Sequence, residues 1–307
     1  MFSELPSIFD RNFVISFFLP ALIFVIVNIG LSYSLGTPLQ LPANSPLQVT
    51  TQIGVASLLG GIILLVLNYE IYRILEGYPL ESLAILKAVE LRRFRHMKRE
   101  LEGLHAERKL YPDDAEMPQR ITDRRPKLWQ EFVRRFPDRE DLVLPTSFGN
   151  TIRAFEVYSR VIYGFDAIPG WERLQAVISK DYSSIVNEAK AITDFCVNLL
   201  LLSFLFALEY IVVLLYMGLP IKLWIPVLSL GIALLAYSRA KGAVRGWGEM
   251  VKGAFDTFLP DLRRKLEFPF PTDMKAEKEL WTKFSRVIIY ERSDIELTRE
   301  KPKDSST

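Results

Sequence analysis

Residues 195–217 read FCVNLLLLSFLFALEYIVVLLYM, and only one of them, Glu209, carries a charge. A helix needs about 20 consecutive apolar residues to cross the hydrocarbon core of a bilayer. This stretch meets that requirement and contains no proline or glycine that would break a helix. We therefore predict a membrane-spanning helix over residues 195–217.

Three more apolar blocks flank this stretch, at residues 12–35, 52–75 and 223–238. The first has no charge, and the second has Glu70 and Arg73 only in its last turns. The fourth is short for a span and follows residue 217 after only five residues, so the last two blocks predict a tight helical hairpin. The first block is too long for a signal-peptide core and lacks a small-x-small cleavage pattern, so we expect a retained helix.

The composition agrees with a membrane protein. Half of the residues are hydrophobic and the mean hydropathy is +0.16, although 24% are charged, so the apolar residues are segregated along the chain. The formal net charge of +2 gives no reason to expect a nucleic-acid partner. A single cysteine, Cys196, excludes an intrachain disulfide framework, and two histidines leave little for a metal site. We expect no cofactor.

The distribution of Lys and Arg predicts the orientation, because positively charged connections remain on the cytoplasmic side. Residues 36–51 have no charge, residues 218–222 have one lysine, and residues 76–194 contain twenty Lys and Arg. We expect both termini and the long central region in the cytoplasm, with two small external loops.

The predicted fold is all-α, with four membrane helices and a helical cytoplasmic domain. No break signal lies between Asp181 and residue 195, and helical spacing continues beyond residue 238 with a kink expected at Pro260, so membrane helices three and four should continue into that domain. The predicted regions are an N-terminal membrane hairpin (1–75), a cytoplasmic helical domain (76–194), a C-terminal membrane hairpin (195–238), a cytoplasmic stalk with a terminal helix (239–290) and a disordered tail (291–307).

Within the cytoplasmic domain, apolar residues recur at helical spacing from Leu80 to Leu104, with basic residues on the remaining surface. That basic surface is either a solvated face or a contact with anionic lipid heads. Residues 111–125 are typical of a loop, and Pro126 suits the first turn of the next helix. Thr146 or Ser147 is expected to cap the helix after that.

A set of motifs resembles an uncharacterised family of bacterial multi-pass membrane proteins. The matching residues lie between 144 and 281: Leu144-Pro145-Thr146, Gly149-Asn150, Arg153, Glu156, Tyr163-Gly164, Asp166, Trp171, Arg173-Leu174, Trp247-Gly248-Glu249, Ala254-Phe255-Asp256 and Trp281. The resemblance implies a bacterial inner-membrane origin and a helical fold, and it implies no particular chemistry. Asn150, Arg153, Glu156, Asp166, Trp171 and Arg173 are therefore expected to serve either partner binding or the fold.

Glu209 is the most informative single residue, because an ionised carboxylate in the middle of a membrane helix is costly. Counting inward from the external helix ends predicts a polar layer that holds Glu209, Asn28, Ser229 and Gly60, one residue from each helix. Such a layer could line a water-filled path with Glu209 as a cation or proton site. Alternatively, Glu209 could form a buried hydrogen bond with Asn28 or Ser229 that fixes helix register.

The second apolar block also has two ridges of small residues, Ala56-xxx-Gly60 and Ser57-xxx-Gly61, which permit a close helix contact within or between chains. No catalytic, cofactor or metal-binding motif is evident. We therefore expect a non-enzymatic, self-associating membrane protein that could conduct ions. The alternative is a structural or adaptor protein that docks a cytoplasmic protein partner through residues 144–174.

Overall fold

The computed structural model describes residues 10–36, 45–111 and 118–297, and within these ranges every regular element is a helix. Four helical segments are long and apolar enough to cross a membrane: Arg11–Tyr33, Pro46–Leu80, Lys180–Tyr216 and Trp224–Lys265. The expected all-α class with four such helices is confirmed. Of the tail expected to be disordered, residues 298–307 lie outside the described ranges.

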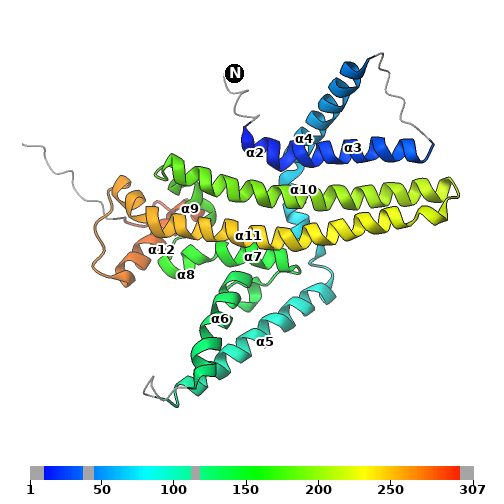
Figure 1. Ribbon diagram of the computed structural model, residues 1–307. Helices are drawn as coiled ribbons and strands as arrows, with labels where there is room; N and C mark the ends of the chain where they lie inside the picture. Colours follow the sequence, from blue (N-terminus) through cyan, green and yellow to red (C-terminus); the bar gives the residue numbers. More distant parts are fainter. Residues whose placement is uncertain (1–9, 37–44, 112–117, 298–307) are drawn as a thin grey trace, which may run out of the picture. The chain divides into compact units, whose positions relative to one another are not determined.

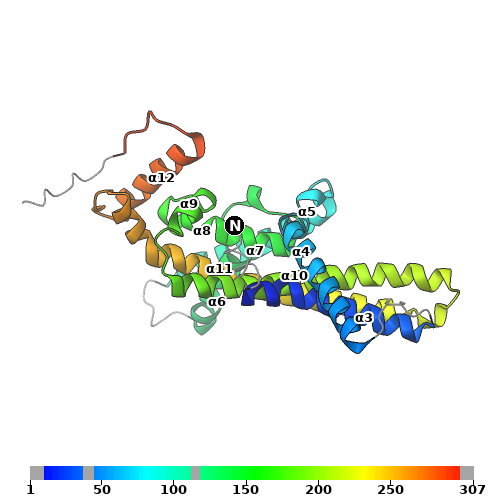
Figure 2. The same cartoon turned by 90° about the horizontal axis from the view of Figure 1, so that it is seen from above.

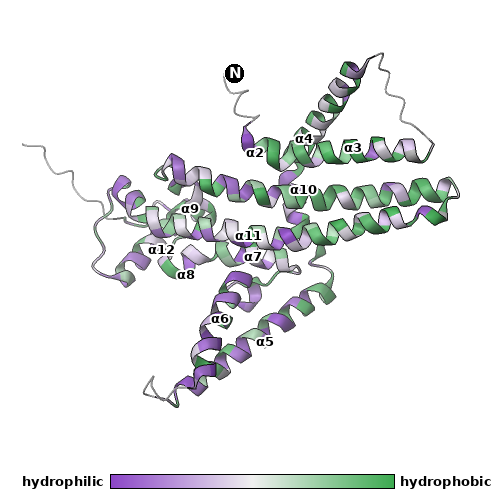
Figure 3. Cartoon of the chain, viewed as in Figure 1, coloured by the Kyte–Doolittle hydropathy of each residue, from purple (hydrophilic) through white to green (hydrophobic). Residues whose placement is uncertain are grey.

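The contacts divide the chain into two compact units. Unit 1 comprises the described residues up to Arg73 together with Asn187–Val244. Unit 2 comprises Ile74–Val186 and the described residues from Arg245 onward. Apolar residues dominate the helices of unit 1, whereas polar residues are frequent on α5 and α6 of unit 2 (Figure 3).

Unit 1 begins with α2 (Arg11–Phe13), a π-helical segment (Val14–Phe18) and α3 (Leu19–Ser34), which form the first span. The second span, α4 (Pro46–Glu76), starts six residues before the expected position. Residues 46–51 (PLQVTT) mix polar and apolar side chains, so hydropathy alone misses this part of the helix. Pro46 is suited to a first helical turn, and the Ser45 hydroxyl accepts a hydrogen bond from the Gln48 N–H at 3.3 Å.

The third and fourth spans are α10 (Lys180–Tyr216) and α11 (Trp224–Lys265). Each is an unbroken helix that contributes residues to both units, as the sequence predicts. Pro260 lies inside α11, which continues to Lys265. The two helices lie side by side as an antiparallel hairpin in both views (Figures 1 and 2).

Two kinds of contact organise unit 1. The first runs along α3 and α10, which are parallel neighbours: the rings of Phe24 and Phe206 meet edge to face at 6.4 Å. The second is the crossing of α4 over α3, visible in Figure 1. A Cβ atom at Gly61 would lie 3.2 Å from Phe18 Cα, so the backbones approach closely there. The small-residue ridge therefore serves a contact within the chain.

Unit 2 contains a hairpin of α5 (Ala84–Arg108) and α6 (Gln119–Arg135) around Phe94, Phe132 and Phe136. The expected start of α6 at Pro126 is wrong, because the helix begins at Gln119. Ile121 in its first turn is buried and provides an apolar anchor before the proline. Residues 112–117 of the expected loop lie outside the described ranges.

The rest of unit 2 comprises α7 (Ser147–Glu156), α8 (Tyr158–Tyr163), α9 (Ala167–Leu174), α12 (Met274–Tyr290) and the end of α11. Its centre is aromatic: the Phe165 ring lies 4.8 Å from that of Trp281 and 6.0 Å from that of Phe255. Thr146, one of the two expected caps, begins α7. Its hydroxyl accepts from Gly149 N–H and donates to Leu75 O at the end of α4.

Candidate functional site

Glu209 lies on the outside of unit 1. With Leu205, Val212 and Tyr216 it forms an exposed stripe along α10, which we call the Glu209 stripe. Among the residues that the structure describes, no group forms a hydrogen bond or an ion pair with its carboxylate. The buried hydrogen bond expected with Asn28 or Ser229 is therefore not formed within one chain.

The other residues of the expected polar layer have different neighbours. Asn28 Nδ2 donates to Phe24 O of its own helix, and its backbone oxygen accepts from the Tyr210 hydroxyl at 3.4 Å. Ser229 donates to Ser203 O at 2.8 Å. A Cβ atom at Gly60 would contact Ala21 Cβ at 3.2 Å.

Asn28 thus lies at the level of Tyr210, next to Glu209, whereas Gly60 and Ser229 both lie near the level of Ser203, so the four residues do not form one layer. Two causes account for the difference. Helix α4 starts earlier than expected, and the connection after α10 folds back, with the Leu219 N–H donating to Leu214 O. Ser229 therefore sits beside Ser203, six residues before Glu209, or about 9 Å along the helix.

A polar contact that the sequence analysis did not identify lies at the π-helical segment. In an α-helix the Ser16 carbonyl would accept a hydrogen bond from residue 20, but Pro20 has no N–H. Asn198 Nδ2 of α10 donates to this carbonyl at 2.8 Å instead, and the Ser16 hydroxyl donates to Ala191 O at 3.2 Å. Asn198 is fully buried, and its Oδ1 atom has no hydrogen-bond partner among the residues that the structure describes.

A second missed cluster surrounds Asp194, which is buried in unit 1. Its carboxylate accepts hydrogen bonds from the Tyr72 hydroxyl at 2.7 Å and from Lys190 Nζ at 2.8 Å. A cavity of about 310 Å³ borders Lys190 and Asp194. The i, i+4 spacing of Lys190 and Asp194 predicts their pairing, whereas Tyr72 is 122 residues away and no local pattern indicates it.

The motif residue Asn150 has a structural role. Its side chain is 0% exposed, and it forms two hydrogen bonds with Leu144: Oδ1 accepts from the Leu144 N–H and Nδ2 donates to the Leu144 carbonyl. Glu90 of α5, also buried, accepts from the Ser147 hydroxyl at 3.0 Å and from Asn150 Nδ2 at 3.3 Å. Asn150 therefore fixes the turn before α7 and joins it to α5.

Arg153 and Glu156 form an ion pair, at 3.3 Å between Nη1 and Oε2, as their spacing predicts. Burial raises the pKa of the Glu156 carboxyl, and the neighbouring Arg153 guanidinium partly offsets that effect. Arg153 also donates from Nη2 to the Tyr78 hydroxyl at 2.5 Å. This pair therefore helps to hold α7 against the end of the second span.

The remaining motif residues also serve contacts inside unit 2. The backbone N–H of Asp166 donates to the Ser285 hydroxyl at 3.0 Å. The ring of Trp171 packs 6.1 Å from that of Phe255. Arg173 Nη1 donates to Pro169 O of its own helix at 2.7 Å. The structure thus supplies a fold-based role for each of these residues.

Two tyrosines share one carboxylate in unit 2. The hydroxyls of Tyr158 and Tyr163 donate to Asp256 of α11 at 2.9 and 2.8 Å. Burial raises the pKa of Tyr158 to about 12, and the hydrogen bond to Asp256 adds to the effect. The pKa of Tyr163 is raised by the same two causes. The pair is therefore held protonated well above neutral pH.

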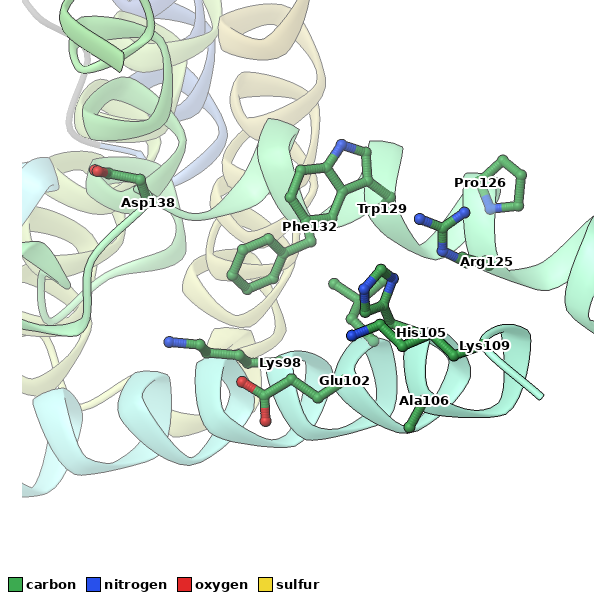
Figure 4. A pocket seen from close by; sticks show the side chains of 11 residues that line it. Lys98, Glu102, His105, Ala106, Lys109, Arg125, Pro126, Trp129, Phe132 and Asp138 are labelled. Atoms are coloured by element: carbon green, nitrogen blue, oxygen red, sulfur yellow. The ribbon is translucent and has the colours of Figure 1, made fainter. Parts of the chain in front are cut away.

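A groove of about 880 Å³ lies between α5 and α6 in unit 2. His105 of α5 faces Trp129 and Phe132 of α6 across it (Figure 4). Trp129 is 57% exposed, which is unusual for so large an apolar side chain. Lys98, Lys109 and Arg125 also line the groove.

Within the described ranges, no cluster of three or more His, Cys, Asp or Glu side chains could hold a metal ion. Comparisons of the chain with protein-family models, with curated proteins and with solved structures found no match.

Proposed function

We propose that this chain is a non-enzymatic bacterial inner-membrane protein that assembles from several copies of itself, with Glu209 beside a water-filled, cation-conducting path between the copies. The exposed position of Glu209 is the observation that carries the proposal. The carboxylate belongs to an apolar span, yet it lies on the outside of unit 1 with no partner among the described residues.

An ionised carboxylate that faces lipid near the middle of a helix costs about 3 kcal/mol on insertion scales. Water or polar groups beside Glu209 would remove this cost. Asn28 and Ser229 are engaged in other contacts of the same chain, so a second copy is the natural source of such an environment. Copies that meet along the Glu209 stripe would bring several carboxylates around one axis, a common arrangement in cation channels.

The location is supported by the charge distribution. The twenty Lys and Arg of residues 76–194 favour a cytoplasmic unit 2 with both termini inside. The motif resemblance supports a bacterial inner membrane.

Two measurements test this proposal: the native mass of the protein and its ion conductance. The protein is solubilised in mild detergent to count its subunits, and it is then reconstituted in planar bilayers. We expect a closed assembly of four or more copies, and we expect Glu209→Gln to lower cation conductance at least tenfold by removing the charge. Glu279→Gln makes the same chemical change at an exposed site of α12 and should leave conductance unchanged. A monomer or dimer, or equal conductance in the two variants, would contradict the proposal.

An adaptor function is the second candidate, and the groove between α5 and α6 is the observation that favours it. Trp129 is exposed there beside Phe132, as in the centre of many protein interfaces. We place the proposed partner site at this groove and not at the expected residues 144–174, since Asn150 and its neighbours already form contacts within the fold. If the protein is monomeric, Trp129→Ala should abolish crosslinking to a cytoplasmic protein that wild type captures, whereas Gln130→Ala should not.

A further inference from the structure

Helix α5 has a side that faces away from the core of unit 2. Five residues recur there at steps of four and three: Ile85, Val89, Arg92, His96 and Arg99. We call them the outer stripe of α5. The opposite side of the helix carries the buried residues Phe94, Met97 and Leu101. The outer stripe is therefore not needed for packing within the chain.

The first half of the outer stripe is apolar and uncovered. Ile85 is 79% exposed and Val89 39% exposed, and the nearby Leu83 and Leu86 are 50% and 39% exposed. Four large apolar side chains thus lie open within seven residues, at the start of a helix in the polar unit. A clustered apolar surface of this kind marks a contact with another protein or with a membrane.

The second half of the outer stripe is cationic. Arg92 and Arg99 are exposed, and neither has a carboxylate partner among the described residues. Arginines on other sides of the same helix are paired differently: Arg93 contacts Glu90, and Arg95 contacts Glu140. The outer stripe therefore holds two uncompensated positive charges of α5.

The position of the outer stripe along the chain identifies what covers it. The second span ends at Glu76 and α5 begins at Ala84, and part of the short connection is a 3-10 turn, Tyr78–Leu80. The apolar half comes first after the membrane, and the arginines follow. Exposed apolar side chains close to the end of a span suit the headgroup boundary, and exposed cations near the membrane surface suit the phosphates of anionic lipids.

We propose that the outer stripe of α5 binds the anionic surface of the cytoplasmic leaflet. Ile85 and Val89 enter the headgroup boundary, while Arg92 and Arg99 contact phosphate groups of acidic lipids. A polyanion such as RNA would use the arginines and leave the apolar half uncovered. The proposal rests on the proposed orientation, because unit 2 has to lie on the cytoplasmic side, and it is independent of any conduction at Glu209.

The test places a fluorescent probe on the outer stripe of the full-length protein. In a Cys196→Ala background, Val89→Cys is labelled with an environment-sensitive dye, and the protein is reconstituted in nanodiscs with a spin-labelled quencher lipid. One set contains phosphatidylcholine only, and the other also contains phosphatidylglycerol. We expect a blue-shifted, quenched emission in the anionic discs, and we expect added salt to weaken it. The same dye at Gln130→Cys on α6 should remain unquenched.

Charge variants test the arginines. Each arginine near an anionic surface raises the binding constant of the stripe for that surface about fivefold. The Arg92→Gln, Arg99→Gln double variant should therefore bind the anionic surface about 25-fold more weakly. Its quenching should then be the same in the two disc types. The Lys283→Gln, Arg286→Gln pair removes two exposed cations of α12 and should leave the difference intact. The native mass of both variants is compared with that of wild type to check that they assemble normally. The comparisons of lipid and salt use a protein with both arginines intact, so they test the proposal even if a charge variant does not fold.

Three outcomes would overturn the proposal. The first is an unquenched probe at position 89 in both disc types, which would leave the outer stripe to a protein or nucleic-acid partner. The second is equal quenching with and without phosphatidylglycerol, which would exclude a preference of the outer stripe for anionic lipids. The third is an equal loss in both charge variants. Each result stands whatever Glu209→Gln does to conductance.

Discussion

At the scale of single residues, the cluster of Tyr158, Tyr163 and Asp256 links the stability of unit 2 to pH. The folded-state pKa of Tyr158 is raised above the ordinary value of about 10 for tyrosine. Its contribution to stability is therefore fully present below pH 10 and is lost as the pH rises through about 12. Folding thus holds these hydroxyls protonated, and alkali weakens unit 2.

We predict that Asp256→Asn lowers the pKa of both tyrosines toward the ordinary value, because it removes the negative charge that accepts hydrogen bonds from their hydroxyls. The absorbance of tyrosinate, measured as a function of pH, reports the pKa values. The same titration of the Tyr158→Phe variant identifies the part of the absorbance change that comes from Tyr158. Asp123→Asn, at an exposed position of α6, is the control and should leave the titration unchanged. A titration of the Asp256→Asn protein identical to that of wild type would contradict the assignment.

Asn198 and Pro20 give a second prediction, in the form of a double-mutant cycle. Asn198→Leu should destabilise the protein by about 2 kcal/mol, because the carbonyl of the buried residue Ser16 loses its donor. In that background Pro20→Ala should recover part of the loss, since a residue with an N–H at position 20 can donate to the same carbonyl. Thermal unfolding in mild detergent gives both values.

Pro260→Ala is the matched control for the cycle, because it also restores an N–H inside a membrane-length helix but far from Asn198 in the chain. It should show no coupling to Asn198→Leu. Equal coupling for the two prolines would mean that the Ser16 carbonyl does not depend on Asn198.

At the scale of elements, the junction of α4 and α7 depends on one glycine. A Cβ atom at Gly149 would lie 2.8 Å from Glu76 Cα and closer still to Glu76 O, and neither backbone atom can move freely. We predict that Gly149→Ala destabilises the protein by about 1–3 kcal/mol. Gly103→Ala should instead stabilise it by up to about 1 kcal/mol, because Gly103 is inside α5 with open space around it. Shifts of the same sign would contradict this account.

Hydropathy and break signals were sufficient to predict the long helices. The apolar run around Glu209 and the absence of a proline or glycine before it predict that α10 starts well ahead of the membrane. The start of α4 could not be predicted this way, because polar residues alternate with apolar ones over residues 46–51. The start of α6 is also earlier than the start signal at Pro126 predicts, because the buried Ile121 anchors a turn ahead of the proline.

The candidate site was only partly predictable, for a different physical reason. The cost of a carboxylate in an apolar span identifies Glu209 from sequence alone. Which residues lie opposite it depends on how the connection after α10 folds back, and that is a tertiary property. The contact of Tyr72 with Asp194 likewise joins distant parts of the chain.

At the scale of the whole molecule, the proposed orientation predicts which side of the membrane each connection occupies. In a Cys196→Ala background, Ile221→Cys lies in the exposed connection after α10 and Ser293→Cys follows α12. An impermeant maleimide should label position 221 in intact spheroplasts and position 293 only after permeabilisation. Labelling of position 293 in intact spheroplasts would reverse the topology.

The boundaries between the two units have a practical consequence. The chain passes from one unit to the other after Arg73, Val186 and Val244, and each of these residues lies inside an unbroken helix: α4, α10 and α11. Proteases cut most readily at exposed loops, and helical backbone resists them. Limited digestion should therefore fail to release either half intact, and the protein has to be purified, stored and degraded as a single piece.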